Sequence, residues 1–180
     1  MKTIIEAIKA QNKNFIHIVF VCTANCCRSP LAEILFEKML VEKLGSMDAL
    51  GKKKLFIDSA ATNISGLKIS ENSMKVLIQE EAVSPERCMA HQGKRLDEID
   101  DADLVLVMAE EHLKRIQANF PQFASISYRL DDFVKADSGI TGDDISDPIG
   151  GSYEAYQIMK NIVKNDLQLL QKEMEDVGII

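Results

Sequence analysis

Four short apolar runs along the chain have the length and composition of buried β-strands. The first covers residues 15–21, reads FIHIVFV, and is rich in the β-branched residues typical of a strand buried on both faces. Residues 55–59 and 103–108 form two further runs, and residues 126–130 form a weaker fourth. These runs predict four strands separated by long connections.

Helical periodicity fills the connections between the predicted strands. Apolar residues recur at helical spacing over residues 30–44, 72–82, 110–120 and 153–174. The first of these helices follows Ser29, takes Pro30 as its first residue and is stopped by Gly45. Strands that alternate with helices favour right-handed crossovers and a parallel sheet covered on both faces, so we expect a three-layer α/β/α fold.

Two segments stand outside this alternation. Residues 1–14 carry isoleucines at helical spacing and predict an N-terminal helical extension, which leaves residues 15–180 as a single domain. Residues 131–151 lack a clear period, and connections of that length are usually functional or disordered. In an open parallel sheet, ligands bind beyond the carboxyl ends of the strands, so a site is expected just after the first strand.

Composition narrows the class of protein further. The 180 residues are 46% hydrophobic and 27% charged, which is ordinary for a soluble globular domain. A net charge of −7 argues against a general affinity for nucleic acid or anionic membranes, and no apolar run is long enough to span a bilayer. The N-terminus is a poor signal peptide because Glu6 interrupts its apolar stretch.

Three of the four cysteines, Cys22, Cys26 and Cys27, lie within six positions. Disulfide-stabilised domains spread their cysteines more evenly, and a chain of this size needs no such cross-links. We therefore expect free thiols and a cytoplasmic location. A zinc site is disfavoured because the cluster has neither a C-x-x-C pair nor a neighbouring pair of histidines.

The sequence VCTANCCRSP places this cluster between the first strand and the first helix. Cys22 ends the strand, and Arg28 follows six residues later where the helix begins. So short a loop directs several backbone N–H groups and the helix dipole to one point, which suits phosphate or arsenate. Arg28 can add a bidentate clamp, and the same groups lower a thiol pKa from ~8.5 to roughly 3.5–7.5. Cys22 would then be a nucleophile for phosphoryl transfer, with Ser29 hydrogen-bonded to its sulfur.

Asp147 is the candidate proton donor. Next to a bound phosphate dianion and partly removed from water, a carboxyl pKa rises from ~3.9 toward values useful for general acid catalysis. Pro148 restricts Asp147 to extended conformations. The alternative interpretations are an ordinary Asp-Pro turn and, for the loop, a buried cysteine beside an unrelated surface arginine.

VCTANCCRSPLAE, together with Asp147-Pro148, resembles the low-molecular-weight protein tyrosine phosphatase family, and the resemblance covers nearly the whole chain. It implies a four-stranded parallel sheet, phosphorylated proteins as substrates, and a reaction that needs no metal or other cofactor. It also implies a two-step mechanism. Cys22 attacks phosphorus, while Asp147 first protonates the leaving group and then activates the hydrolytic water.

The same resemblance implies roles for residues around the loop. Arg28 and the loop would hold the phosphoryl oxygens, and the matching loop positions are Thr23, Ala24, Asn25, Cys26, Cys27 and Ser29. Asn25 matches the residue that shapes the loop, and Ser59 and His91 match its polar partners. A reversible Cys22–Cys27 disulfide that protects the nucleophile is also implied, with simple packing as the alternative role of Cys27.

Departures from the family pattern bear on the substrate. Ala24 and Ala61 stand where the family usually has glycine, and a methyl group at Ala24 would clash if that backbone needs a positive φ. Cys26 replaces the Ile of many tyrosine-specific members and the Thr of the bacterial protein-arginine phosphatase branch, which the Pro148-Ile149 sequence also resembles. Phosphotyrosine is the leading substrate and phosphoarginine the alternative, ahead of an arsenate reductase or a non-catalytic phosphate-binding module.

The remaining candidates have structural roles as their simplest interpretation. His17 lies in a predicted strand and His112 on a predicted helix, where both are expected to be structural. Tyr153 and Tyr156 are the aromatic residues nearest the site, and helix packing is an equally good role for Tyr156. The protein is expected to be a monomer or weak dimer that binds phosphorylated proteins and neither nucleic acid nor membranes.

Overall fold

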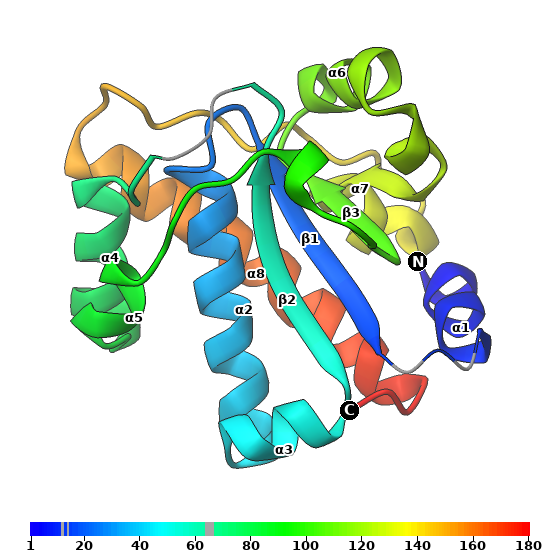
Figure 1. Ribbon diagram of the computed structural model, residues 1–180. Coiled ribbons are helices and arrows are strands. Elements are labelled where there is room, and N and C mark those ends of the chain that lie inside the picture. Colours follow the sequence, from blue (N-terminus) through cyan, green and yellow to red (C-terminus); the bar gives the residue numbers. More distant parts are fainter. Residues whose placement is uncertain (12, 14, 64–66) are drawn as a thin grey trace.

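Four parallel strands form the central sheet of the computed structural model, which describes residues 1–11, 13, 15–63 and 67–180 (Figure 1). Their order across the sheet is β2-β1-β3-β4, and every neighbouring pair is parallel. The strands are β1 (Ile16–Cys22), β2 (Leu55–Ala61), β3 (Leu104–Val107) and β4 (Ser127–Arg129). The expected α/β fold with a four-stranded parallel sheet is confirmed.

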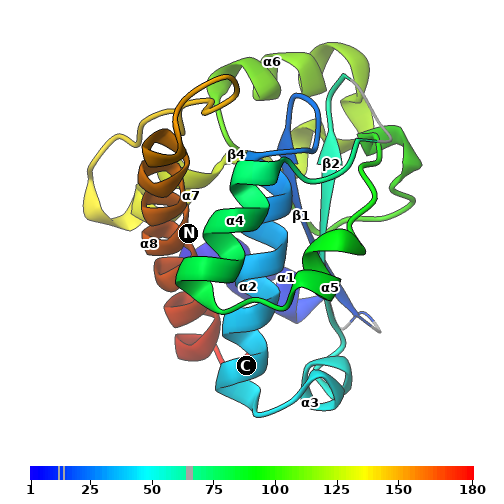
Figure 2. The same cartoon turned by 90° about the vertical axis from the view of Figure 1, so that its left-hand side faces the viewer.

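Helices cover both faces of this sheet. Two long helices, α2 and α8, pack together on one face with α4 beside them, and α6 covers the other face (Figures 1 and 2). No helix within the described residues is long and apolar enough to cross a membrane. The helices are α1 (Lys2–Ala10), α2 (Arg28–Leu44), α3 (Met47–Lys52), α4 (Glu71–Glu81), α5 (Pro85–Met89), α6 (Glu110–Asn119), α7 (Leu130–Lys135) and α8 (Tyr153–Asp176).

Strand β1 lies between β2 and β3 and is buried on both faces. Ile18 and Phe20 pack in the cluster formed with α2 and α8, whereas Val19 and Val21 pack in the opposite cluster with Ile116 of α6. Successive side chains of a strand point to opposite faces, so both sets must be apolar. The apolar residues 18–21 therefore reflect the part of β1 that has no side facing water.

Helix α2 begins two residues earlier than the sequence predicts. Its first residue is Arg28 rather than Pro30, because Pro30 falls within the first turn, where backbone N–H groups lack intrahelical acceptors and a proline is tolerated. Gly45 ends the helix as predicted, in the left-handed conformation with a φ of 90°. The earlier start places Arg28 at the helix N-terminus, directly after the cysteine-rich loop.

Part of the segment expected to lack a period is helical. Helix α7 buries Leu130, Phe133 and Val134, and a 3₁₀ turn follows at Ala136–Ser138. A helix of six residues is too short to produce a periodic signal. Its first residue, Leu130, also falls within the strand predicted at 126–130. Residues 139–151 contain neither helix nor strand and lead into α8.

The N-terminal segment forms α1, which packs against the rest of the chain. Ile5 and Ile8 are buried in the larger core cluster, and the Nζ of Lys9 donates a hydrogen bond to the carbonyl of Val177. Residues 12 and 14 of the predicted extension lie outside the described residues.

Replacing Leu35 by alanine tests the assigned core. Leu35 lies on α2 and is fully buried, so Leu35→Ala leaves a cavity and should lower the free energy of unfolding by about 2–5 kcal/mol. Leu169→Ala on α8 is the matched control, because Leu169 is 42% exposed and its loss should cost no more than about 0.5 kcal/mol. Chemical denaturation measures both, and equal losses would contradict the core described above.

Candidate active site

The loop formed by residues 23–27 joins the carboxyl end of β1 to the N-terminus of α2. Cys22 is the last residue of β1 and Arg28 is the first of α2. Backbone hydrogen bonds fix the loop to the chain that follows β2, since Thr62 N–H donates to the carbonyl of Cys22 and Ser70 N–H donates to that of Cys26. The loop therefore occupies the carboxyl edge of the sheet.

The backbone N–H groups of this loop are unpaired. Within the described residues, none of the N–H groups of residues 23–27 donates a hydrogen bond to a protein acceptor. Residues Asn25, Cys26 and Cys27 are nevertheless buried. Unpaired N–H groups of this kind are rare in folded proteins, and a cluster of them at a helix N-terminus is suited to binding an anion.

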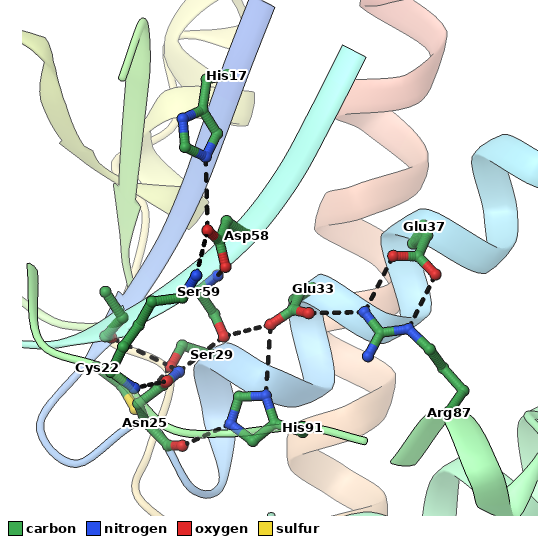
Figure 3. A network of polar contacts seen from close by, with 12 residues as sticks. His17, Cys22, Asn25, Ser29, Glu33, Glu37, Asp58, Ser59, Arg87 and His91 are labelled. Carbon is green, nitrogen blue, oxygen red and sulfur yellow. Dashed lines mark hydrogen bonds and ion pairs between the residues drawn. The ribbon is translucent and has the colours of Figure 1, made fainter. Parts of the chain in front are cut away.

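Asn25 holds the turn of this loop. It adopts the left-handed conformation with a φ of 51°, and its side-chain Nδ2 donates to Ser29 Oγ at 2.9 Å and to Ser59 Oγ at 2.7 Å (Figure 3). Its backbone carbonyl accepts a hydrogen bond from His91 Nε2 at 3.0 Å. The left-handed position is thus Asn25 and not Ala24, so the clash considered for the methyl group of Ala24 does not arise.

A buried carboxylate, Glu33, lies at the far end of the same network. Its Oε2 accepts a hydrogen bond from Ser59 Oγ at 2.5 Å, and its Oε1 accepts one from Arg87 Nη2 at 2.6 Å (Figure 3). His91 Nδ1 lies 3.6 Å from Oε2. Burial alone would raise the pKa of Glu33, but its contacts with His91, Ser59 and Arg87 outweigh burial and hold that pKa below its usual value.

Ionised Glu33 sets the direction of every hydrogen bond between itself and Cys22. A carboxylate can only accept, so Ser59 must donate to it and accept from Asn25. Asn25 Nδ2 gives its second hydrogen to Ser29 Oγ, which leaves the Ser29 hydroxyl free to donate to Cys22 Sγ at 3.1 Å. The Ala60 carbonyl, at 3.5 Å, is the more distant acceptor for that hydroxyl. The network therefore ends on a hydroxyl that donates to the sulfur of Cys22.

Arg28 meets the long loop between α7 and α8 beside Cys22. Its guanidinium is 3% exposed; Nη1 donates to the Ile145 carbonyl at 3.1 Å and Nη2 to Asp147 Oδ2 at 2.5 Å. The Nε of Arg28 is buried and has no hydrogen-bond partner among the described residues. The Asp147 side chain is 40% exposed. The fold thus brings the candidate acid to the candidate clamp across 119 positions of sequence.

Cys27 contacts other partners than the one that the resemblance implies. Its Sγ lies 3.7 Å from Cys26 Sγ and 3.6 Å from the Tyr156 hydroxyl, and all four cysteines are free thiols. A hydrogen bond from Cys26 is the largest cause that lowers the pKa of Cys27, and the same contact raises that of Cys26. Burial is the main cause that raises the pKa of Tyr156 to about 12. A Cys22–Cys27 disulfide stays a prediction.

His112 is a neighbour of the loop that the sequence did not reveal. It lies in the first turn of α6, is fully buried, and places Nε2 3.0 Å from Thr23 Oγ1. The strand order could have indicated this position. Strand β3 neighbours β1, so the residues that follow both strands lie at the same edge of the sheet. His17, by contrast, lies near the start of β1 and contacts Asp58 and the carbonyl of Asp101.

The chemistry of the site is that of an oxyanion and a thiol. Unpaired loop amides and a buried arginine nitrogen point to an anion, and a hydroxyl donates to the sulfur at its centre. In the part of the chain that the structure describes, no group of three or more His, Cys, Asp or Glu side chains is arranged to hold a metal ion.

Comparisons with known proteins agree with this geometry. The family model for low molecular weight phosphotyrosine protein phosphatases matches residues 17–177. The low molecular weight protein-tyrosine-phosphatase PtpB of Staphylococcus haemolyticus is 34% identical over 140 residues, which cover 78% of this chain and 86% of that protein. The protein-arginine-phosphatase of Bacillus subtilis is 28% identical over 160 residues, covering 88% of this chain and 96% of that protein.

Solved structures give the same result. The crystal structure of the low molecular weight protein tyrosine phosphatase from T. tengcongensis superimposes with a TM-score of 0.72 at 28% identity, covering 87% of this chain and 98% of that one. The crystal structure of YfkJ from Bacillus subtilis also gives a TM-score of 0.72, at 25% identity, over 93% of this chain and 99% of the other. The chain belongs to the low molecular weight phosphotyrosine protein phosphatase family.

Proposed function

We propose that this protein is a cysteine-dependent phosphatase that hydrolyses phosphotyrosine in proteins through a cysteinyl-phosphate. The observation that carries the proposal is the set of unpaired N–H groups of residues 23–27 and the unpaired Nε of Arg28, gathered around a cysteine that accepts a hydrogen bond. These donors suit the equatorial oxygens of a phosphoryl group. The Cys22 sulfur, at the centre of the loop, would attack phosphorus on the side opposite the leaving oxygen.

The reaction proceeds in two displacements at phosphorus. Cys22 thiolate forms an S–P bond as the ester P–O bond breaks, and Asp147 gives its proton to the leaving oxygen. Asp147, now a carboxylate, takes a proton from water as that water attacks phosphorus and the S–P bond breaks. Arg28 and the loop amides hold the three equatorial oxygens throughout, and the Ser29 hydroxyl stabilises the sulfur as it leaves.

The contact between Arg28 and Asp147 links substrate binding to the position of the proton donor. In the structure, Arg28 Nη2 donates to Asp147 Oδ2 at 2.5 Å. A phosphoryl dianion competes for the same guanidinium. Its arrival therefore releases the Asp147 side chain, which is 40% exposed, to face the leaving oxygen.

Phosphoarginine is the second candidate substrate. Protein-arginine-phosphatases of Bacillus subtilis and Geobacillus stearothermophilus are each 28% identical to this chain. Two features favour it, since Cys26 gives the loop a small side chain, and Ile149 after the Asp-Pro pair is 64% exposed and is not a tyrosine. Phosphotyrosine stays the leading proposal because the matching family model and the PtpB relatives bear that name.

We also propose a cytoplasmic location and a monomeric or weakly dimeric state. The four free thiols support the location, because a reducing compartment keeps cysteines in that form. The apolar clusters on both faces of the sheet are covered by helices of the same chain, which supports a core that needs no partner subunit to cover it.

Replacing Cys22 by serine tests the nucleophile. Cys22→Ser should abolish hydrolysis of an aryl phosphate in the presence of EDTA, because a serine hydroxyl has no comparable ionised form near neutral pH. Cys88→Ala is the control, since Cys88 is a buried thiol of α5 whose sulfur makes no hydrogen bond to the loop among the described residues, and its loss should leave turnover in place. Steady-state kinetics measure both variants, and turnover that survives Cys22→Ser would rule out the mechanism.

Asp147→Asn tests the proton donor. An amide cannot supply a proton, so kcat with phosphotyrosine should fall by roughly 10²–10⁴. The loss should shrink with an aryl phosphate whose leaving group is already a weak base, since that oxygen needs less protonation. Asp143→Asn, an exposed position of the same loop, serves as the control. A loss below about threefold in Asp147→Asn would place the acid at another residue.

The substrate is decided by the ratio of kcat/KM for matched phosphotyrosine and phosphoarginine peptides. We expect the ratio to favour phosphotyrosine in the natural protein. Cys26→Ile should raise the ratio by adding apolar wall beside the ring, and Cys26→Thr should lower it by adding a hydroxyl that accepts from a guanidinium. A tenfold preference for phosphoarginine would overturn the leading assignment, and an unchanged ratio in both variants would remove Cys26 as the selecting residue.

A further inference from the structure

The contact between His112 and Thr23 is a further side-chain anchor of the loop formed by residues 23–27, in addition to the contacts of Asn25. His112 Nε2 lies 3.0 Å from Thr23 Oγ1, and Thr23 is the residue that directly follows the nucleophile. The histidine is fully buried, while Thr23 is partly exposed at the mouth of the loop. A buried polar ring that contacts the loop but takes no part in the mechanism above needs an explanation.

The surroundings of His112 fix where its proton lies. A neutral imidazole has one N–H, and Nδ1 is buried with no hydrogen-bond partner among the described residues. Nε2 faces two acceptors, Thr23 Oγ1 at 3.0 Å and Glu111 Oε1 at 3.6 Å, and a carboxylate can only accept. An orphaned buried donor is also costlier than an orphaned acceptor. Nε2 therefore carries the hydrogen and donates it to Thr23.

His112 stays neutral while it does so. Burial is the main cause that lowers its pKa to about 3, and the nearby Arg28 and Arg115 lower it further. Asp144 opposes this shift, and Glu111 faces the ring from the same helix. A neutral donor fixes Thr23 without adding a charge that would titrate near neutral pH.

We propose that His112 is a positioning residue that holds Thr23, and that the Thr23 hydroxyl donates its own hydrogen to an oxygen of the bound phosphoryl group. Because Oγ1 accepts from His112, its single hydrogen is left for another partner, and no protein acceptor contacts it among the described residues. The partly exposed position beside Cys22 leaves the bound oxyanion as that partner. This inference rests on the proposed function.

Binding of inorganic phosphate tests the proposal separately from turnover. Thr23→Val should weaken phosphate binding by roughly 10–100-fold, the worth of one hydrogen bond to a charged group, and Thr23→Ser should restore most of it. His112→Asn, whose amide cannot reach Thr23, should also weaken binding. His112→Gln, whose amide nitrogen takes the place of Nε2, should stay within about threefold of the natural protein. Calorimetric titration gives the affinities, and thermal unfolding shows that each variant is folded.

The combined variant separates positioning from mere packing. If His112 acts through Thr23, His112→Asn should cause no further loss of phosphate affinity in a Thr23→Val background. Losses that add in full would assign His112 to packing alone and overturn the proposal, as would unchanged affinity in Thr23→Val. His112→Gln should also keep the natural pH profile of kcat/KM between about pH 5 and 8, where a neutral histidine does not titrate. Failure of the natural protein itself to bind phosphate would instead contradict the proposed function.

Discussion

The left-handed backbone of Asn25 is the constraint on which the site depends. A residue with a side chain is strained by about 1–2 kcal/mol in this conformation, and a short polar side chain offsets the strain when it bonds locally. The Asn25 side chain donates to Ser29 and Ser59 and accepts from the N–H of Lys94. The Asn25 carbonyl accepts from His91. The reversal that it imposes keeps the amides of residues 23–27 away from protein acceptors. These amides lie between β1 and α2 and are the donors of the proposed anion site.

The polarity of the surrounding network matters as much as its geometry. A buried carboxylate is costly unless it is paired, and Arg87 from α5 pairs with both Glu33 and Glu37 of α2. Ionised Glu33 then orders the hydroxyl and amide hydrogens between itself and Cys22 in one direction. Helix α5 contributes no residue to the loop, but through Arg87 and Glu33 it supports the Ser29 hydroxyl that donates to Cys22.

The features of the site that the sequence predicts are the local ones. Cys22, Arg28 and Ser29 fall at a junction between a strand and a helix, and their spacing alone places them together. Residues 131–151 stand out because no period accounts for them, and Asp147 within that segment does reach Arg28. Ser59 and His91, inferred from the resemblance, do contact Asn25 in the structure.

Other contacts depend on packing that no local pattern encodes. Glu33 lies in the first half of a helix whose periodicity gives no sign that a carboxylate there is buried. Arg87, Tyr156 and His112 come from helices far apart in the sequence, and only the folded chain brings Arg87 to Glu33 and the other two side chains to the loop. The same holds for Cys27, whose contacts with Cys26 and Tyr156 follow from the approach of α8 rather than from the spacing of the cysteines.

In the proposed mechanism, phosphate leaves the substrate by way of the sulfur of Cys22. The most direct measurement is rapid acid quenching of the protein during turnover of a phosphotyrosine substrate, followed by mass spectrometry of the peptide that carries Cys22. We expect one phosphoryl group on that cysteine during the burst of product release. A peptide without phosphate at every time point, while phosphotyrosine is being consumed, would contradict it.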